Sequence, residues 1–120
     1  MRYIVAMDSF KGSLTSEEAG KAVADNLKSH DEEAEIKVLS VSDGGDGMLE
    51  AFCKATHATR LSVLTRDALM RRIEAQYAIT PDGTAIIEVA QACGLMHIEH
   101  EQRNPMRTTS YGVGLLVADA

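Results

Sequence analysis

A chain of 120 residues is long enough for one domain with a hydrophobic core, and its 45% hydrophobic and 25% charged residues are ordinary for a globular protein. The net charge of −6 argues against a nucleic-acid or anionic-membrane surface, because both need a basic face. The apolar run between Arg2 and Asp8 is too short for a signal peptide or a membrane helix, so we expect a cytoplasmic protein. Cys53 and Cys93 are isolated, which favours reduced thiols over a metal clip.

The first half of the chain predicts a strand, a helix and a second strand. Residues 3–7 form a short apolar run that ends at Asp8 and is typical of a buried strand. A helix follows, since Thr15 and Glu18 have the spacing of a capping box. Residues 35–41 alternate between apolar and polar side chains, as a strand does. This order predicts a right-handed unit with two parallel strands.

Both predicted strands end in an aspartate, a Gly/Ser-rich turn and the start of a helix. The turns are residues 8–13 and 42–47, and the second leads into a helix that runs to about Thr56. Loops at the carboxyl ends of parallel strands are where ligands bind, and glycines let backbone N–H groups approach an anion. Aspartates at the same place can hold a metal or a substrate hydroxyl. The two loops together indicate phosphoryl transfer to a small molecule.

The residue pattern changes after Thr56, from one typical of helices to one typical of strands. Residues 60–65, 72–79 and 84–89 are strand-like, and the turn signal at residues 80–83 predicts a hairpin between the last two. Antiparallel strands after a parallel unit indicate a second subdomain.

The expected fold class is therefore α/β, with a parallel, flavodoxin-like β–α–β start followed by the beginning of a second mixed α/β subdomain. We place the parallel segment at residues 1–57 and the mixed segment at residues 58–120.

The last third of the chain predicts two helical stretches. Residues 91–95 are expected to form one helical turn that Gly94 closes in the left-handed conformation. A longer helix is expected through Val113, Leu116 and Val117, with an apolar face that lacks an obvious partner. Because this helix has no stop signal, we expect a truncated segment of a longer protein. Its exposed apolar face should make the 120 residues either self-associate, as a homo-oligomer, or be only marginally stable.

The strongest chemical signal is the loop of residues 43–47. Its three glycines expose successive N–H groups that can receive an oxyanion. Asp46 can cap the following helix, which leaves Asp43 to point into the crevice. The alternative is a tight turn in which Asp43 accepts a bond from its own backbone. The glycine positions exclude an EF-hand loop.

The first loop combines a carboxylate, hydroxyls and a lysine. Lys11 can neutralise a phosphate or a substrate carboxylate beside Asp8 and Ser9. The loop is not a Walker A motif, because the lysine precedes the glycine. The alternative is that Lys11 is simply solvated and that Asp8 only ends the strand.

Three further positions carry candidate chemistry. Thr108 and Thr109 open the last helix and can either offer its amides to an anion or simply cap it. Arg103, in a loop, can clamp a carboxylate through two parallel bonds, or be a surface arginine. Glu88 ends an apolar strand, where a charge needs a partner or a role.

The motifs together resemble the N-terminal region of bacterial glycerate kinases. The resemblance rests on the segments 8–14, 43–47, 85–88, 93–95, 103–105 and 108–112, in this order. It covers nearly the whole chain, which looks like the first third of a member of that family.

The resemblance implies transfer of the γ-phosphoryl group of ATP, with Mg²⁺, to a hydroxyl of D-glycerate, giving 2-phosphoglycerate. Its expected partners are glycerate and ATP, without nucleic acid or membrane, and the isolated 120 residues are expected to be inactive. Lys11 and Arg103 would hold the glycerate carboxylate, and Asp8 or Asp43 would take the proton of the attacking hydroxyl. The residues carried over are catalytic Asp8, Lys11 and Asp43, and substrate-binding Ser9, Gly44, Gly45, Asp46, Glu88, Arg103, Thr108 and Thr109, with no resident metal ligand.

The chain departs from the family pattern at three places. Asp46 stands where glutamate is frequent, and Met7 where proline is usual. Residues 66–69 replace the usual Gly-Pro-Leu-Gly stretch, which leaves the geometry of that turn open.

Two other classes compete with a kinase. A phosphoacceptor receiver domain needs a lone acceptor aspartate after its third strand, whereas the second aspartate motif here follows the second strand. A non-catalytic module that binds an organic acid through the same loops stays open.

Overall fold

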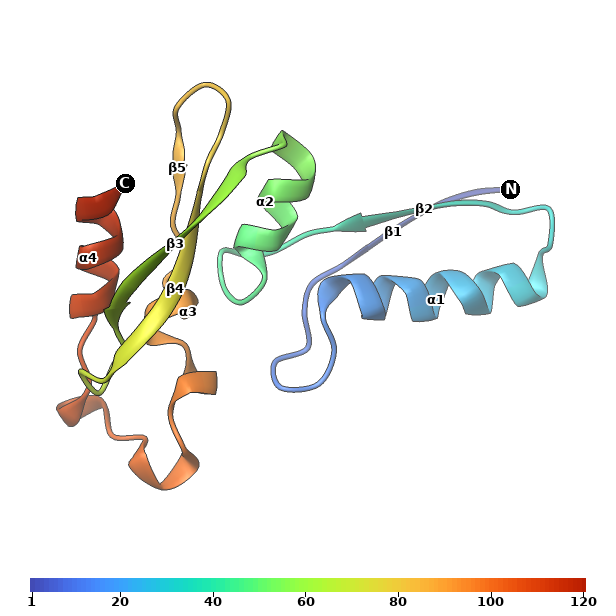
Figure 1. Cartoon of the computed structure of the whole chain (residues 1–120). Helices are drawn as coiled ribbons and strands as arrows, with labels where there is room; N and C mark the ends of the chain where they lie inside the picture. Colours follow the sequence, from blue (N-terminus) through green and yellow to red (C-terminus); the bar gives the residue numbers. More distant parts are fainter. The chain divides into compact units, whose positions relative to one another are not determined.

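The computed structural model describes residues 1–120, which divide into two compact units, Met1–Ala51 and Phe52–Ala120 (Figure 1). The division falls within helix α2 (Met48–Thr56). The first unit contains a parallel pair of strands, and the second contains an antiparallel sheet. The predicted fold class, a parallel β–α–β start followed by a mixed α/β segment, is confirmed.

The first unit consists of strand β1 (Arg2–Met7), helix α1 (Ser16–His30) and strand β2 (Glu35–Ser40). The strands pair in parallel and in level register, from Arg2 opposite Glu35 to Met7 opposite Ser40. Helix α1 packs on both strands. Because the register is level, both strands end at the same edge of the sheet.

The sequence fixes where α1 begins and how closely it approaches the sheet. Thr15 Oγ1 accepts a bond from Glu18 N, and Glu18 Oε2 accepts one from Thr15 N, so the predicted capping box is confirmed. A Cβ atom on Gly20 would lie 2.5 Å from Cγ1 of Val38. The helix therefore reaches β2 only because residue 20 has no side chain.

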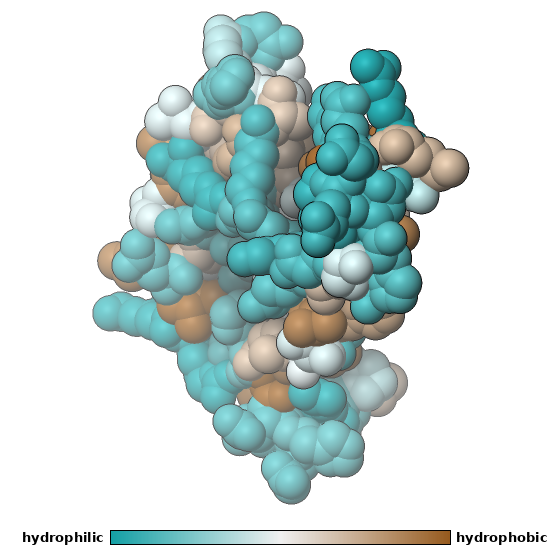
Figure 2. Space-filling model, turned by 90° about the vertical axis from the view of Figure 1, so that its right-hand side faces the viewer, coloured by the Kyte–Doolittle hydropathy of each residue, from teal (hydrophilic) through white to brown (hydrophobic).

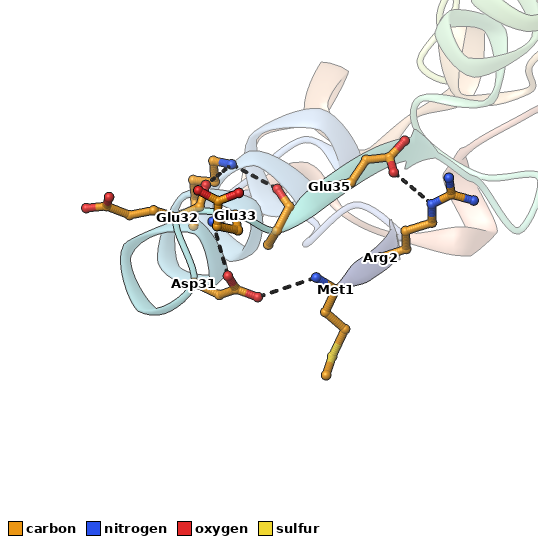
Figure 3. Close-up of polar contacts among 8 residues, drawn as sticks. Met1, Arg2, Asp31, Glu32, Glu33 and Glu35 are labelled. Carbon is orange, nitrogen blue, oxygen red and sulfur yellow. Dashed lines mark hydrogen bonds and ion pairs between the residues drawn. The ribbon is translucent and has the colours of Figure 1, made fainter.

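Polar contacts link residues at the edge of this sheet where both strands begin (Figure 3). The terminal amine of Met1 lies 3.7 Å from Asp31 Oδ2, and Arg2 Nε lies 2.7 Å from Glu35 Oε2. These groups are exposed, so each pair contributes little to stability. Charged side chains thus line the edge where the strands begin, while the edge where they end carries the two loops.

The two-stranded sheet buries one face only. Val5 is 6% exposed and Ile4 is 72% exposed, as expected for neighbours on opposite faces of a strand. Leu39, on the same face as Ile4, is also exposed. In the space-filling view, hydrophobic side chains reach the surface in patches among hydrophilic ones (Figure 2).

The second unit contains strands β3 (Thr59–Arg66), β4 (Arg72–Ile79) and β5 (Ala85–Ile86), paired antiparallel in that order. The hairpin predicted around residues 80–83 joins β4 to β5 and is confirmed. The third strand is shorter than predicted, because the chain turns after Ile86 toward helix α3 (Ala90–Cys93).

Helices α3 and α4 (Tyr111–Asp119) cover the sheet of the second unit and complete its core. The expectation that the last helix lacks a partner is wrong: Leu116 is fully buried against Ala75 and Tyr77. Tyr77 OH also donates to Asp119 Oδ2 at 2.9 Å. Only part of the apolar surface of α4 stays exposed, chiefly Val117 at 61%.

The segment between α3 and α4 contains three 3-10 turns, η1 (Leu95–His97), η2 (His100–Gln102) and η3 (Pro105–Arg107). The left-handed conformation expected for Gly94 is wrong, since its φ is −63°. Glycine is needed there for another reason: a Cβ atom would lie 2.5 Å from the carbonyl oxygen of Ala90. No helix in the structure has the length and hydropathy of a membrane span.

Candidate active site

Ser16, the first residue of α1, hydrogen-bonds to the backbone at the carboxyl ends of both parallel strands. Ser16 Oγ donates to the carbonyl oxygen of Met7 at 2.6 Å and accepts a bond from Val41 N at 3.2 Å. The two loops that follow the strands therefore start from fixed and adjacent positions.

The two loops also contact each other directly. Ser9 Oγ, in the first loop, donates to the carbonyl oxygen of Asp46, in the second, at 3.2 Å. Ser9 and Asp46 are both half-buried. This bond joins segments 37 residues apart and brings the aspartates of both loops to one edge of the sheet.

Each loop aspartate uses one carboxylate oxygen to shape its own turn. Asp8 Oδ1 accepts a bond from Ser9 N at 2.7 Å, and Asp43 Oδ1 accepts one from Gly45 N at 2.9 Å. The turn role considered for Asp43 is thus present. It does not exclude chemistry, because a carboxylate accepts about four hydrogen bonds and both side chains are exposed.

The glycines of the second loop allow backbone that other residues adopt at a cost. Gly44 and Gly47 have φ values of +101° and +91°, in the left-handed region. Backbone of this kind can present successive N–H groups to an oxyanion; here Gly44 N donates to Ser42 Oγ at 3.2 Å, as Gly45 N does to Asp43 Oδ1. Helix α2 begins at Met48, directly after this loop.

Lys11 lies at the tip of the first loop. Phe10 and Leu14 exchange backbone bonds at 2.8 and 3.1 Å, and Gly12 has a φ of +74°. This tight turn exposes Lys11 to solvent. The ammonium is therefore placed to act as a point charge toward an anion.

The second unit contains a pocket of about 370 Å³ among its loops. Its walls come from the β3–β4 turn, the end of α3 with η1, and the segment before α4; the lining residues are Ala68, Cys93, Leu95, Ile98, Arg103, Asn104, Pro105, Thr108, Thr109 and Ser110. The volume lies at the lower end of the range that accepts small ligands.

Arg103 supplies a cation to this pocket, and backbone groups hold its guanidinium. Its Nε donates to the carbonyl oxygen of Ile98 at 3.2 Å, and its Nη2 donates to that of Leu95 at 3.3 Å. A guanidinium has five N–H donors, so two bonds to carbonyls leave others for a carboxylate. The geometry suits recognition of an organic acid.

Hydroxyls and one thiol line the opposite side of the pocket. Thr109 Oγ1 accepts a bond from Tyr111 N at 3.1 Å at the start of α4, while Ser110, the N-cap residue, makes no side-chain capping bond. Cys93 Sγ donates to the carbonyl oxygen of Thr109 at 3.3 Å. Burial raises the pKa of the Cys93 thiol, which favours its neutral form.

The predicted site residues thus fall into two groups. The first unit brings together Asp8, Ser9, Lys11, Asp43, Gly44, Gly45 and Asp46; the second brings Arg103, Thr108 and Thr109 to its pocket. Glu88 belongs to neither group: it is 3% exposed, between β5 and α3. Its proposed role in substrate binding stays a prediction.

Asp67, to which the sequence motifs assigned no role, organises the β3–β4 turn. Asp67 is fully buried, and its Oδ1 accepts bonds from Leu69 N and Arg71 N, both at 2.8 Å. An aspartate that closes a turn on its own backbone is ordinary turn chemistry, so the signal was present in the sequence. The bonds of Asp67 shape this turn without the glycines and proline that the resemblance leads us to expect there.

Comparison with known proteins places these features in a family. The model of the glycerate kinase family matches residues 3–120. The chain is 36% identical over 118 residues to glycerate kinase of Haemophilus influenzae, and 35% identical over 121 residues to glycerate 2-kinase of Escherichia coli. These alignments cover 98% and 100% of the chain but 31% and 32% of the relatives, so the chain spans about a third of their length.

A solved structure agrees with the family match. The crystal structure of a protein assigned as glycerate kinase 2 from Salmonella typhimurium LT2 aligns with a TM-score of 0.71 at 34% identity. The alignment covers 99% of the chain and 32% of that protein.

Proposed function

The chain belongs to the glycerate kinase family, and on that premise we propose that it is the N-terminal portion of a kinase that phosphorylates D-glycerate with ATP. The product we propose is 2-phosphoglycerate, made in the cytoplasm, where ATP is available. The observation that carries the proposal is the pair of aspartate loops joined by the bond from Ser9 to Asp46. We expect no turnover from the 120 residues alone.

The proposed reaction depends on positioning and charge neutralisation more than on covalent catalysis. Phosphoryl transfer is accelerated mainly by orientation of the nucleophile and neutralisation of charge. Asp8 or Asp43 orients the attacking hydroxyl and accepts its proton, since each carboxylate keeps capacity beyond its turn bond. Lys11 neutralises an anionic group at the same edge, and the amides of the glycine loop contact phosphate oxygens.

In the second unit, Arg103 recognises the carboxylate of the substrate. Backbone carbonyls already hold two of its nitrogens, so little side-chain entropy is lost on binding. Thr108 and Thr109 add hydroxyls at the pocket wall.

The donor set of the first unit fits Mg²⁺. This ion prefers oxygen ligands and is commonly held by one or two carboxylates together with substrate phosphates. Asp8 and Asp43 are carboxylates on contacting loops, and no group of three potential ligands converges in the structure. Whichever of the two does not take the proton would hold the ion, which would neutralise phosphate charge.

The proposal is tested in a chimera in which this chain replaces the corresponding first third of Haemophilus influenzae glycerate kinase. Asp43→Asn keeps an oxygen for the bond from Gly45 N but removes the basic carboxylate, so we expect kcat to fall about 100-fold or more. Asp25→Asn, on the exposed side of α1, is the matched control and should leave kcat unchanged. Near-normal turnover of the Asp43→Asn chimera, with an unchanged melting temperature, would remove Asp43 from the mechanism.

A second candidate function is non-catalytic binding of an organic acid, which the pocket around Arg103 favours because the second unit forms it alone. Titration calorimetry of the 120-residue chain separates the candidates. Binding of D-glycerate together with an inactive chimera would support the module, and an active chimera would exclude it.

A further inference from the structure

The structure contains a buried charge that the proposed chemistry does not use. Asp67 is 0% exposed, at the turn between β3 and β4. Burial acts to raise the pKa of Asp67, but hydrogen bonds from Arg71 and Leu69 outweigh it, so the pKa is lowered and the carboxylate is charged. A buried carboxylate is costly unless it is paired, so its presence calls for a reason.

Only one of the two carboxylate oxygens of Asp67 closes the turn. Oδ1 closes the turn by accepting from Leu69 N and Arg71 N. Oδ2 instead accepts a bond from Arg71 Nε at 2.5 Å, which fixes the direction of the arginine side chain. An asparagine would close the turn equally well through its own oxygen. The second oxygen therefore serves to orient Arg71.

Arg71 connects this turn to the pocket. Its Nη2 donates to the carbonyl oxygen of His97, the last residue of η1. The carbonyls on either side of His97 in this segment, those of Leu95 and Ile98, accept the two bonds from Arg103. Backbone carbonyls within residues 95–98 thus accept hydrogen bonds from both Arg71 and Arg103.

The β3–β4 turn is also hydrogen-bonded to the pocket wall that precedes α4. The carbonyl oxygen of Ala68, next to Asp67, accepts a bond from Thr109 N at 3.0 Å. Ala68 and Thr109 both line the pocket. The β3–β4 turn is therefore bonded to the wall before α4 directly, and to the wall around Arg103 through Arg71.

We propose that Asp67 and Arg71 are positioning residues that set the orientation of the Arg103 guanidinium in the pocket. The proposal rests on the proposed function in one respect, that Arg103 is the group that recognises the substrate carboxylate. The positioning itself is a property of the second unit and can be measured without turnover.

The first test observes Arg103 directly in the 120-residue chain. The Nε–Hε proton of Arg103, assigned by its disappearance in Arg103→Lys, exchanges slowly when Nε donates to Ile98. We expect Asp67→Asn and Arg71→Gln to speed its exchange on the order of tenfold, the factor that corresponds to loss of one charged hydrogen bond. Arg72→Gln, at the next position of the chain, is the matched control and should leave the rate unchanged. Unchanged exchange in Asp67→Asn, whose turn bonds are retained, would overturn the proposal.

The second test separates positioning from mere stability in the active chimera. Arg71→Gln should raise the KM for D-glycerate about fivefold, the size of a typical coupling between contacting residues, while the KM for ATP stays constant. In an Arg103→Ala background the same change should have no further effect. Equal effects in both backgrounds would show a purely structural role and overturn the proposal. If Arg103→Ala alone leaves the KM for glycerate unchanged, the recognition role of Arg103 fails, and the exchange rates decide the positioning role by themselves.

Discussion

Replacing Gly112 with alanine introduces one methyl group where helix α4 meets strand β3. The added Cβ would lie 1.8 Å from the carbonyl oxygen of Arg66, 2.8 Å from its carbonyl carbon and 3.2 Å from Thr65 Oγ1. The nearest obstacle is backbone in the sheet, which cannot rotate away as a side chain can. Helix α4 must therefore shift by more than an ångström from β3.

The cost of this shift is estimated from the interactions that it disturbs. Overpacking costs about 1–3 kcal/mol. The buried bond from Thr65 Oγ1 to the carbonyl oxygen of Gly112, 2.8 Å long, is strained or lost, which costs a further ~1 kcal/mol or more. The higher helix propensity of alanine returns about 1 kcal/mol. The net destabilisation should be about 1–3 kcal/mol, enough to lower the melting temperature of a unit of this size by roughly 5–20 °C.

Thermal and urea unfolding followed by circular dichroism measure this effect. Gly114→Ala in the same helix is the matched control, because its Cβ meets nothing within 4 Å. It should stabilise the chain by up to about 1 kcal/mol through helix propensity alone. If both variants are equally stable, or if Gly112→Ala is as stable as the unaltered chain, the packing of α4 on β3 described above is wrong.

Three further predictions concern the turns and the helix start. Thr15→Ala removes the capping box with Glu18 and should destabilise the chain by about 1 kcal/mol in urea unfolding; no change would show that α1 does not depend on its cap. Met70 has a φ of +66°, so Met70→Gly should stabilise the chain by about 0.5–1 kcal/mol, and a loss of stability in the same assay would contradict the strain assigned there. Hydrogen bonds to Arg71 and Leu69 hold the pKa of Asp67 below its ordinary value of 3.8, so the unfolded chain binds more protons near that pH and stability must fall as the pH drops through it. Asp67→Asn should lose stability less steeply below about pH 4, and identical pH profiles would contradict the assignment.

The local signals of the sequence predicted much of the fold. The capping box of Thr15 and Glu18 and the turn at residues 80–83 act over a few residues, so their outcome is visible in the sequence itself. The parallel pairing of β1 and β2 follows from a strand–helix–strand order with one preferred hand. The contact of the two aspartate loops then follows from the level ends of the strands.

Features that depend on distant contacts were not predictable. Gly94 does end α3, but in extended backbone rather than the left-handed conformation expected, which is a difference of local geometry. The partners of α4 lie in β3 and β4, about 40 residues or more earlier: Gly112 lies against Arg66, and Tyr77 shares a buried cluster with Leu116. The link from Asp67 through residue 71 to the pocket joins segments whose spacing carries no periodic signal.

We have proposed that this chain is the N-terminal portion of a glycerate kinase, and phosphorylation of D-glycerate by the chimera tests that proposal most directly. The assay follows ATP consumption and identifies the product by ³¹P NMR, with the 120-residue chain alone as the reference. The account predicts ATP-dependent formation of 2-phosphoglycerate by the chimera and no turnover by the 120 residues. A folded chimera that binds ATP but leaves D-glycerate unphosphorylated would contradict it.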